Sequence, residues 1–365
     1  MIKFYKKEEE MKKLLSLLIV LALVIGLVSL TACGKKEEEQ PPEEKLKVVL
    51  YINGTLGDKS FFDSANRGVE RAIKELGIEG KVIEGGYDPA KWEPDLEQLS
   101  EGDWDIIIVG TWQMTENLEK IAPKHPDKKY FIFDTTVDYS KGNLDNVYSI
   151  LYKQNEGSFL VGALAAMITT SDMPLANSEK IIGFLGGMDI PVINDFKVGY
   201  IQGAHYIDPD IKVLVSYAGS FSDPAKGKEL VLAQYDQGAD ISFNVAGETG
   251  LGLLDAAKER DKYAIGVDSD QYIMFKDSDP EKAAHIVTSM MKNVDNSLFR
   301  GIKLHMEGKL EYGKAEALGI KEGGVGVADN ENYKKLVPEE FRKKIKELEE
   351  KIVNGEIVVD TAFGQ

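Results

Sequence analysis

A series of short, almost continuously apolar runs, with helically spaced stretches between most of them, constrains the fold of this chain most. The runs are Lys47–Asn53, Trp104–Gly110, Tyr130–Asp134, Lys180–Leu185, Ile211–Tyr217, Asp240–Val245 and Tyr263–Asp268. Helical stretches such as Asn155–Thr169 and Pro224–Gly238 separate most of them. Strands that are apolar on both faces and alternate with helices predict an α/β fold, with parallel sheets covered by helices on both sides.

Two segments of the chain, residues 47–72 and 180–204, share one layout. Each has a lysine-led apolar run, a glycine-containing turn with an aspartate (Asp58, Asp189) and a helical stretch with a central glycine. This repeat predicts two doubly wound α/β lobes that face each other. Ligands of such sheets bind at the carboxyl ends of the strands, so a small-molecule site is expected in the cleft between the lobes.

The N-terminal region has the order of a lipoprotein signal peptide. Two lysines at 12 and 13 precede an apolar stretch, which ends at Leu30-Thr31-Ala32-Cys33. This pattern predicts a lipobox, with residues 1–32 removed and Cys33 lipidated as the mature N-terminus. The alternative is a transmembrane anchor that happens to end near a cysteine. Either Met1 or Met11 can be the start, and Met11 directly precedes the lysines.

These features predict how the chain is divided into domains. A lipid on Cys33 would hold the protein at the extracytoplasmic face of the cell membrane, and a charged, proline-bearing linker would follow over residues 33–45. The predicted division assigns residues 46–153 and about 268–300 to the N-terminal lobe, 154–267 and about 301–335 to the C-terminal lobe, and 336–365 to a C-terminal helix and tail. The apolar stripe of the last helix, Pro338–Asn354, favours packing on its own lobe over a coiled coil, because it lasts only about two heptads.

Composition excludes several classes of function. The chain has 365 residues and a formal net charge of -17, which opposes binding to nucleic acid. Its single cysteine, Cys33, allows no internal disulfide and, once acylated, leaves no thiol for catalysis. The four histidines are scattered, and no metal-binding or catalytic motif is present. We therefore expect no enzyme activity, no metal and no cofactor.

The loop Gly54–Ser60 (GTLGDKS) follows the first apolar run and superficially resembles a phosphate-binding loop. Its glycine spacing is wrong for a P-loop, and Asp58 would repel a phosphate. An ionised aspartate only accepts hydrogen bonds, so it suits a neutral ligand with N–H or O–H donors. The alternative is that Asp58 or Ser60 simply caps the following helix.

Aromatic and polar residues follow several other apolar runs. Phe61, Trp112 and Phe221 each come after the carboxyl end of a predicted strand. Two aromatic faces brought together at such an edge could clamp a planar base.

Asp134, Asp268 and Lys292 add polar groups near other strand or helix ends, and each alone is more often a cap or a surface charge. The glycine-rich stretch that begins at Gly247 lacks a dinucleotide-binding pattern. Its glycines would instead let the backbone approach a ligand or a neighbouring strand.

Five separated motifs carry a resemblance to a known family. They are GDKSFFDSANRGVERA (57–72), AGSFSDPAKGKELVLAQYDQGAD (218–240), TGLGLLDAAKE (249–259), IGVDSDQ (265–271) and VTSMMKNVDNS (287–297). From Lys47 to Val327 the chain closely resembles the basic membrane protein family, the lipoprotein receptors of ABC importers that are similar to bacterial purine nucleoside receptors. The resemblance implies a type I periplasmic-binding-protein fold, with two lobes, a hinge of crossing strands and a ligand between them.

The resemblance also implies roles for individual residues. Phe61 and Phe221 would sandwich the base, and Asp58 would read its edge. Asp268 and Lys292 would hold the ribose.

Asp134 is the weakest match to the family's site. Phe62 departs from the family, because many members have asparagine there. Such a change implies either a different ligand or a Phe62 side chain that turns into the lobe.

The expected function is therefore a solute receptor that delivers a nucleoside, with a purine favoured, to an ABC permease and its ATPase. Three alternatives remain open. They are a sugar or signalling-molecule receptor of the same fold, a surface sensor or interaction lipoprotein, and an extracellular nucleoside hydrolase. The last is disfavoured because the sequence has no calcium-binding cluster of aspartates.

Overall fold

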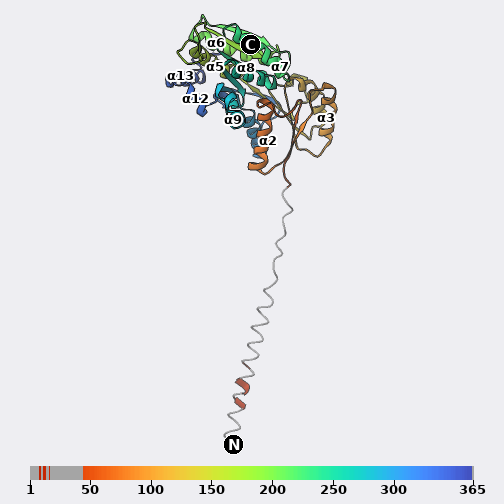
Figure 1. Ribbon diagram of the computed structural model, residues 1–365. Coiled ribbons are helices and arrows are strands. Elements are labelled where there is room, and N and C mark those ends of the chain that lie inside the picture. Colours follow the sequence, from red (N-terminus) through yellow and green to blue (C-terminus); the bar gives the residue numbers. More distant parts are fainter. Residues whose placement is uncertain (1–7, 10, 14–15, 17–43, 364–365) are drawn as a thin grey trace. The chain divides into compact units, whose positions relative to one another are not determined.

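The computed structural model describes residues 44–363, together with 8–9, 11–13 and 16. The chain from Lys45 onward forms one unit with two α/β lobes (Figure 1). The lipobox, Cys33 and the linker up to residue 43 lie outside the described residues. No helix in the described part of the chain is both long and apolar enough to cross a membrane.

The first lobe is built on a six-stranded parallel sheet in the order β2-β1-β3-β4-β5-β11. Its strands are β1 (Lys47–Ile52), β2 (Glu79–Glu84), β3 (Ile106–Gly110), β4 (Lys129–Phe133), β5 (Val147–Tyr152) and β11 (Lys314–Leu318). Its helices are α2 (Phe61–Leu76), α3 (Pro89–Glu101), α4 (Thr115–Ile121) and α11 (Val294–Met306). Val48 and Leu50 pack with α2, whereas Val49 packs with α3 on the other face, as the two-residue period of a strand requires.

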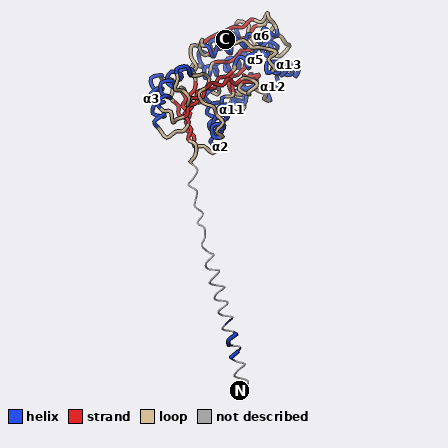
Figure 2. Tube along the Cα trace, turned by 180° about the vertical axis from the view of Figure 1, so that it is seen from behind, coloured by secondary structure: helices blue, strands red, loops and turns tan. Residues whose placement is uncertain are grey.

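The second lobe repeats this order, as β7-β6-β8-β9-β10-β12, and only β12 is antiparallel to its neighbour. Its strands are β6 (Ile181–Gly186), β7 (Lys212–Tyr217), β8 (Ile241–Val245), β9 (Tyr263–Asp268), β10 (Ile286–Lys292) and β12 (Val325–Val327). Its helices are α5 (Gln154–Thr169), α6 (Pro191–Ile207), α7 (Pro224–Asp236), α8 (Leu251–Arg260), α9 (Gln271–Phe275) and α10 (Pro280–His285). In both lobes the strands lie between layers of helices (Figure 2).

The central glycines of the sequence repeat have the same role in both lobes. A Cβ atom on Gly68 of α2 would lie 2.7 Å from the carbonyl oxygen of Asp295 in α11. A Cβ atom on Gly199 of α6 would lie 2.2 Å from the carbonyl oxygen of Asn155 in α5. Each glycine therefore lets two helices approach more closely than any side chain would allow.

The lobe boundaries differ from the predicted division. The sequence predicts that residues from about 268 to 300 belong to the first lobe, but β10 pairs with β9 in the second sheet. Conversely, α11 packs on α2 and β11 pairs with β5, so residues 294–318 belong to the first lobe rather than partly to the second. The chain crosses between lobes three times, and the crossing segments are hydrogen-bonded: Lys153 N donates to Leu318 O (3.0 Å), and Asn293 N donates to Gly324 O (2.8 Å).

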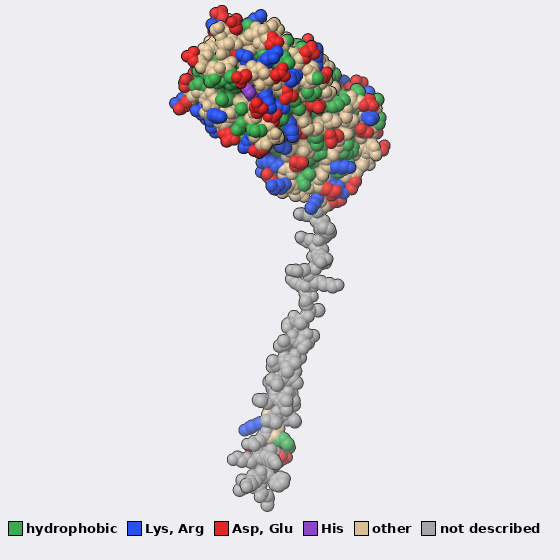
Figure 3. Space-filling model, in the orientation of Figure 1, with side chains coloured by type: hydrophobic (Ala, Val, Ile, Leu, Met, Phe, Trp, Pro, Cys, Tyr) green, Lys and Arg blue, Asp and Glu red, His purple; other side chains and the backbone are tan. Residues whose placement is uncertain are grey.

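Two further helices end the chain, α12 (Glu331–Leu336) and α13 (Glu339–Val353). Ile345, Leu348 and Ile352 of α13 are buried in contact with the rest of the body, where α13 packs against α5. This confirms that the last helix packs on its own chain. On the face seen in Figure 3, acidic and basic side chains are interspersed.

Candidate ligand-binding site

A cavity of about 310 Å³ lies between the two lobes, where the carboxyl ends of strands from both sheets meet. The structure places all eight candidate ligand contacts on its wall: Asp58, Phe61, Trp112, Asp134, Phe221, Gly247, Asp268 and Lys292. Their contact with a ligand remains a prediction. Among the described residues, no group of three or more His, Cys, Asp or Glu side chains is arranged to hold a metal ion.

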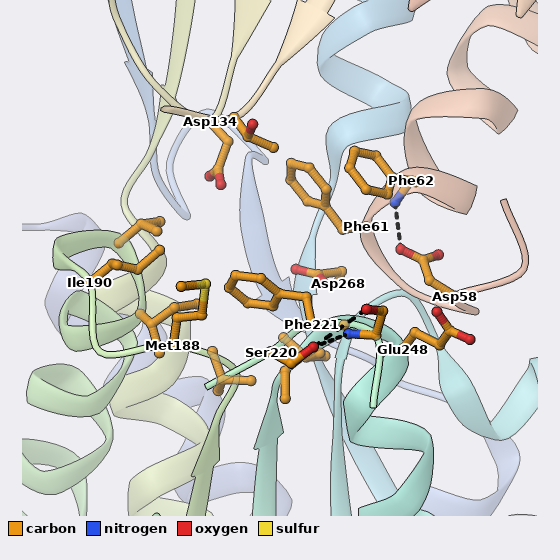
Figure 4. A pocket seen from close by; sticks show the side chains of 18 of the residues that line it. Asp58, Phe61, Phe62, Asp134, Met188, Ile190, Ser220, Phe221, Glu248 and Asp268 are labelled. Carbon is orange, nitrogen blue, oxygen red and sulfur yellow. Dashed lines mark hydrogen bonds between the residues drawn. The ribbon is translucent and has the colours of Figure 1, made fainter. Parts of the chain in front are cut away.

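Two aromatic rings enter the cavity from opposite lobes (Figure 4). Phe61 is the first residue of α2, and Phe221 lies in the loop between β7 and α7. Phe133 supports the Phe61 ring, with centroids 5.3 Å apart. Phe221 rests on Gly187, where an added Cβ would lie 2.3 Å from its ring. Both rings are thus held by their own lobes.

Trp112 and Phe62 also line the cavity. The Trp112 side chain is half exposed, so only part of it is enclosed. The Phe62 ring lies against Gly54 and meets Phe61 edge-on, with centroids 5.3 Å apart. Phe62 therefore packs against its own lobe while it also forms part of the cavity wall, so its effect on the ligand stays a prediction.

Asp58 caps α2 while it faces the cavity. Its carboxylate accepts hydrogen bonds from the backbone N–H groups of Ser60 (3.0 Å), Phe62 (2.8 Å) and Asp63 (3.1 Å). Burial raises the pKa of Asp58, and these three bonds oppose the rise. Oδ2 accepts only the Phe62 bond, which leaves it able to accept one more donor. Capping and ligand recognition are therefore compatible at Asp58.

Lys292 is a buried cation surrounded by rings. Its side chain is only 2% exposed, and its ammonium forms an ion pair with Asp134. Nζ lies 5.5 Å from the centroid of Phe61, 5.3 Å from that of Tyr152 and 4.9 Å from that of Phe196. Burial raises the pKa of Asp134, and the adjacent Lys292 opposes that rise. The pair places one positive and one negative group at the same wall of the cavity.

Asp268 joins the two lobes. Its Oδ2 accepts a 2.6 Å hydrogen bond from Ser60 Oγ, at the start of α2. Burial raises the pKa of Asp268 to about 7, despite the opposing effects of Lys292 and the Ser60 bond. This carboxyl group therefore titrates near neutral pH.

Three non-glycine residues at strand ends have left-handed backbones and line the cavity. Thr111, Asp134 and Asp268, at the carboxyl ends of β3, β4 and β9, have φ values of 69°, 66° and 62°. Such conformations cost about 1–3 kcal/mol each and tend to occur at ligand sites. Their gathering at one cavity supports its assignment as the functional site.

Sequence reasoning missed part of the wall: Asn53, Tyr87, Thr111, Gln113, Met188, Ile190, Phe196, Ser220 and Glu248. Two signals could have found some of them. Asn53 ends the first apolar run, and Met188 and Ile190 occupy the turn that matches the Asp58 loop in the repeat. Phe196 lies inside a helix, and no local pattern marks it.

Comparisons with known proteins agree with this architecture. The model of the Bmp family, described as ABC transporter substrate-binding protein PnrA-like, matches residues 45–362. Basic membrane protein A of Borreliella burgdorferi is 33% identical over 345 residues, covering 93% of this chain and 94% of the relative. An uncharacterized lipoprotein of Pyrococcus abyssi is 32% identical over 355 residues, covering 87% of this chain and 85% of the relative.

Solved structures confirm the fold. An ABC transporter solute-binding protein from Aeropyrum pernix K1 superposes with a TM-score of 0.76 at 29% identity, covering 86% of this chain and 94% of that chain. The arabinose-binding protein AraP from Geobacillus stearothermophilus has a TM-score of 0.59 at 12% identity, covering 80% of this chain and all of that chain, and it shows the fold alone. The expected two-lobed fold of periplasmic solute-binding proteins is therefore confirmed.

Proposed function

The chain belongs to the PnrA-like family of ABC transporter substrate-binding proteins, and from that premise we propose that it binds a nucleoside, preferably a purine nucleoside, in the interlobe cavity. The family is one of solute-binding proteins rather than enzymes, and its members work with a transporter permease. What this chain binds, and how it is held at the membrane, are the proposed points.

The pairing of aromatic rings from opposite lobes carries the proposal. Phe61 and Phe221 project into one cavity, so a flat ring system could stack on both once the lobes enclose it (Figure 4). Stacking of a base on an aromatic side chain contributes about 1–3 kcal/mol per base. A sugar alone would gain less from this arrangement, which favours a nucleoside over the sugar-receptor alternative.

The polar groups beside the rings suit a ribose. Asp134 and Asp268 can accept hydrogen bonds from hydroxyl groups, and Lys292 can donate to hydroxyl oxygens. Carboxylates outnumber cations on this wall, because Asp58 also faces the cavity and only Lys292 is basic among the lining residues. A phosphate would be repelled, so we expect nucleosides to bind better than nucleotides.

Calorimetry on residues 45–365, which form one structural unit, tests the proposal. The ligands are inosine, guanosine, adenosine, cytidine, free ribose and inosine 5′-monophosphate. We expect purine nucleosides to bind most tightly, and ribose and the monophosphate to bind at least ~10-fold more weakly. If no nucleoside binds at high protein concentration, the proposal is wrong. Ribose binding as tightly as inosine would favour a sugar receptor.

We also propose that a lipid on Cys33 holds the protein at the extracytoplasmic face of the membrane. The support is the Leu30–Cys33 lipobox and the lipoprotein description of the Pyrococcus abyssi relative. Labelled palmitate should enter the full-length chain but not the Cys33→Ala variant, which should also leave the membrane fraction. Equal labelling of both proteins would contradict lipidation at Cys33.

A further inference from the structure

We propose that residues 358–362, near the C-terminus, form a strap that positions the part of the cavity wall contributed by α6. Attachment of the strap and binding of a ligand are then coupled, although no residue of the strap lines the cavity. The strap acts through Asp195 of α6, which is a positioning residue because it does not line the cavity either. The inference goes beyond the proposed function and rests on it only for the ligand of the binding test.

The first observation is that side chains of two helices in the second lobe hold the backbone of the strap. Asn155 Nδ2 of α5 donates to Val359 O (3.2 Å) and to Asp360 O (3.0 Å). Gln202 of α6 donates through Nε2 to Val358 O (3.1 Å), and its Oε1 accepts from Asp360 N (2.8 Å). The Val359 side chain also packs, half-buried, against the hydrophobic core. The strap is therefore an ordered part of the second lobe.

The second observation is a buried carboxylate that receives most of its hydrogen bonds from the strap. Asp195 lies in the second turn of α6 and is only 1% exposed. Its Oδ1 accepts from Thr361 Oγ1 (2.6 Å) and from Ala362 N (2.9 Å), and its Oδ2 accepts from Gln154 Nε2 (2.6 Å). A buried carboxylate is costly without such donors, so the strap stabilises this turn of α6.

The third observation is that the same turn of α6 forms part of the cavity wall. Ile193 and Phe196, on either side of Asp195 in the sequence, both line the cavity. The centroid of the Phe196 ring lies 4.9 Å from Lys292 Nζ. Burial is the main cause of the raised pKa of Asp134, and the negative charge of Asp195 adds to the rise. A displacement of this turn would therefore change the apolar wall and the charged pair together.

The fourth observation is that the strap reaches the first crossing between the lobes. Gln154, which donates to Asp195, is the first residue of α5. Lys153, just before it, donates through its backbone N to Leu318 O at 3.0 Å. Lobe closure changes the backbone at such crossings. Closure and attachment of the strap therefore act on the same group of side chains.

These contacts make the proposed coupling reciprocal. If the strap holds α6 in the form that binds ligand, its loss lowers the population of that form, and the apparent affinity falls in proportion. A bound ligand must then hold the strap more firmly, although the two are not in contact. A tail that only added stability to the fold would show neither effect.

The binding test uses calorimetry with inosine on residues 45–365 and on a variant that ends at Ile357. We expect the truncation to weaken inosine binding by at least ~5-fold, because it removes the hydrogen bonds to Asn155, Gln202 and Asp195. Thr361→Val removes one donor to Asp195 and should weaken binding by at least ~2-fold. Thr361→Ser keeps the hydroxyl and should bind like wild type.

Val358→Ala is the matched control within the strap. The Val358 side chain is 74% exposed, and its backbone bond to Gln202 is kept in the variant. Its affinity for inosine and its melting temperature should be those of wild type. The comparison of Thr361→Val with Thr361→Ser keeps the test decisive if the truncated chain is unstable.

Hydrogen exchange followed by mass spectrometry tests the coupling from the other side. In wild type, inosine should slow exchange at the amides of Asp360 and Ala362, by about the factor that truncation costs in affinity. Without ligand, truncation should speed exchange over residues 191–200 of α6. Exchange over α3, in the first lobe, should not change.

The outcomes separate the strap from the proposed function. If wild type binds inosine but truncation leaves the affinity unchanged, or inosine leaves exchange in the strap unchanged, the coupling is overturned. If wild type binds no nucleoside, the proposed function fails by itself. The ligand-free exchange then decides on the strap, because unchanged exchange over α6 after truncation overturns its positioning role and faster exchange there supports it.

Discussion

At the scale of single residues, the buried Lys292–Asp134 pair dominates the electrostatics of the cavity. Replacing Lys292 with Met would leave the Asp134 carboxylate buried without its cation. We expect the free energy of unfolding to fall by about 3–5 kcal/mol, as when one partner of a buried pair is removed. Urea denaturation followed by circular dichroism measures the change.

A double variant and a surface control isolate the cause. Lys292→Met combined with Asp134→Leu removes both charges and should recover much of the lost stability, while nucleoside binding stays weak. Lys343→Met breaks an exposed pair with Glu339 and should leave the unfolding midpoint unchanged. A double variant as unstable as the single one would show that the unpaired carboxylate is not the cause.

Asp268 makes stability depend on pH near neutrality. Its folded-state pKa is raised to about 7 by burial, so the folded protein binds a proton that the unfolded chain releases at lower pH. The stabilisation that this proton gives the folded state is fully present below the ordinary aspartate pKa. It is lost as the pH rises through about 7. Compared with Asp268→Asn, wild type should therefore lose stability between about pH 5 and pH 8, by at least ~1 kcal/mol.

The measurement is urea denaturation of both proteins across that pH range. Asp240→Asn is a suitable comparison, because burial also raises the pKa of Asp240, which lies outside the cavity wall. Parallel pH profiles for wild type and Asp268→Asn would refute the assignment of the titration to Asp268.

Residue positions at strand ends could be predicted from the sequence, whereas their contacts could not. Phe61 and Phe221 follow apolar runs, so their place at one sheet edge followed from the α/β pattern. Asn53 also ends such a run, but its amide donates hydrogen bonds to Thr111 and Gln113, which are distant in sequence. Hydrogen bonds between residues that follow different strands leave no local signal.

At the scale of elements, the close contact between α2 and α11 depends on Gly68, which has no side chain. Gly68→Ala would place Cβ 2.7 Å from the backbone oxygen of Asp295 and push the helices apart. Alanine favours a helix over glycine by about 1 kcal/mol, but overpacking against backbone costs about 1–3 kcal/mol. We expect a net loss of thermal stability, measured by calorimetric melting.

Gly326→Ala is the matched control, because no atom lies within 4 Å of a Cβ added there. It should melt within about a degree or two of wild type. If Gly68→Ala melts as high as Gly326→Ala, the two helices can separate at no cost, and the close-contact explanation is wrong.

Most predicted strands are buried on both faces, but β7 has no fully buried residue, and the buried strands β5 and β10 were not predicted. All seven apolar runs correspond to strands, β1, β3, β4 and β6–β9. The strands β2, β5, β10, β11 and β12 were missed. β11 (KAEAL) and β2 (EGKVIE) are largely polar edge strands with exposed residues, so they lack the apolar signal. The lobe boundaries were misplaced because the crossing points depend on which strands pair, and pairing is a long-range property.

At the scale of the whole molecule, hydrogen bonds hold the lobes together beside the cavity. Ser269 Oγ donates to Ser60 O at 2.9 Å, and Arg67 Nη2 donates to Ser269 Oγ at 2.8 Å. Ser269 belongs to the second lobe, whereas Ser60 and Arg67 belong to the first. Because three chain crossings allow hinge motion, such contacts should set the balance between open and closed forms.

Ser269→Ala should therefore shift the ligand-free protein toward the open form. The apparent affinity falls in proportion to the closed population, and loss of two hydrogen bonds of about 1 kcal/mol each lowers the ratio of closed to open protein by roughly 5- to 30-fold. Small-angle scattering should show a larger radius of gyration without ligand, and a saturating nucleoside should restore the compact form.

Ser100→Ala is a closely matched control within one lobe. Ser100 Oγ also makes two hydrogen bonds, donating to Leu96 O at 2.8 Å and accepting from the Tyr130 hydroxyl at 2.8 Å. That variant should lose thermal stability but keep the scattering profile and affinity of wild type, because both partners lie in the first lobe. If Ser269→Ala instead loses stability while its nucleoside affinity and radius of gyration stay those of wild type, the interlobe hydrogen bonds do not control closure. In that case the balance between open and closed forms depends on the crossing segments alone.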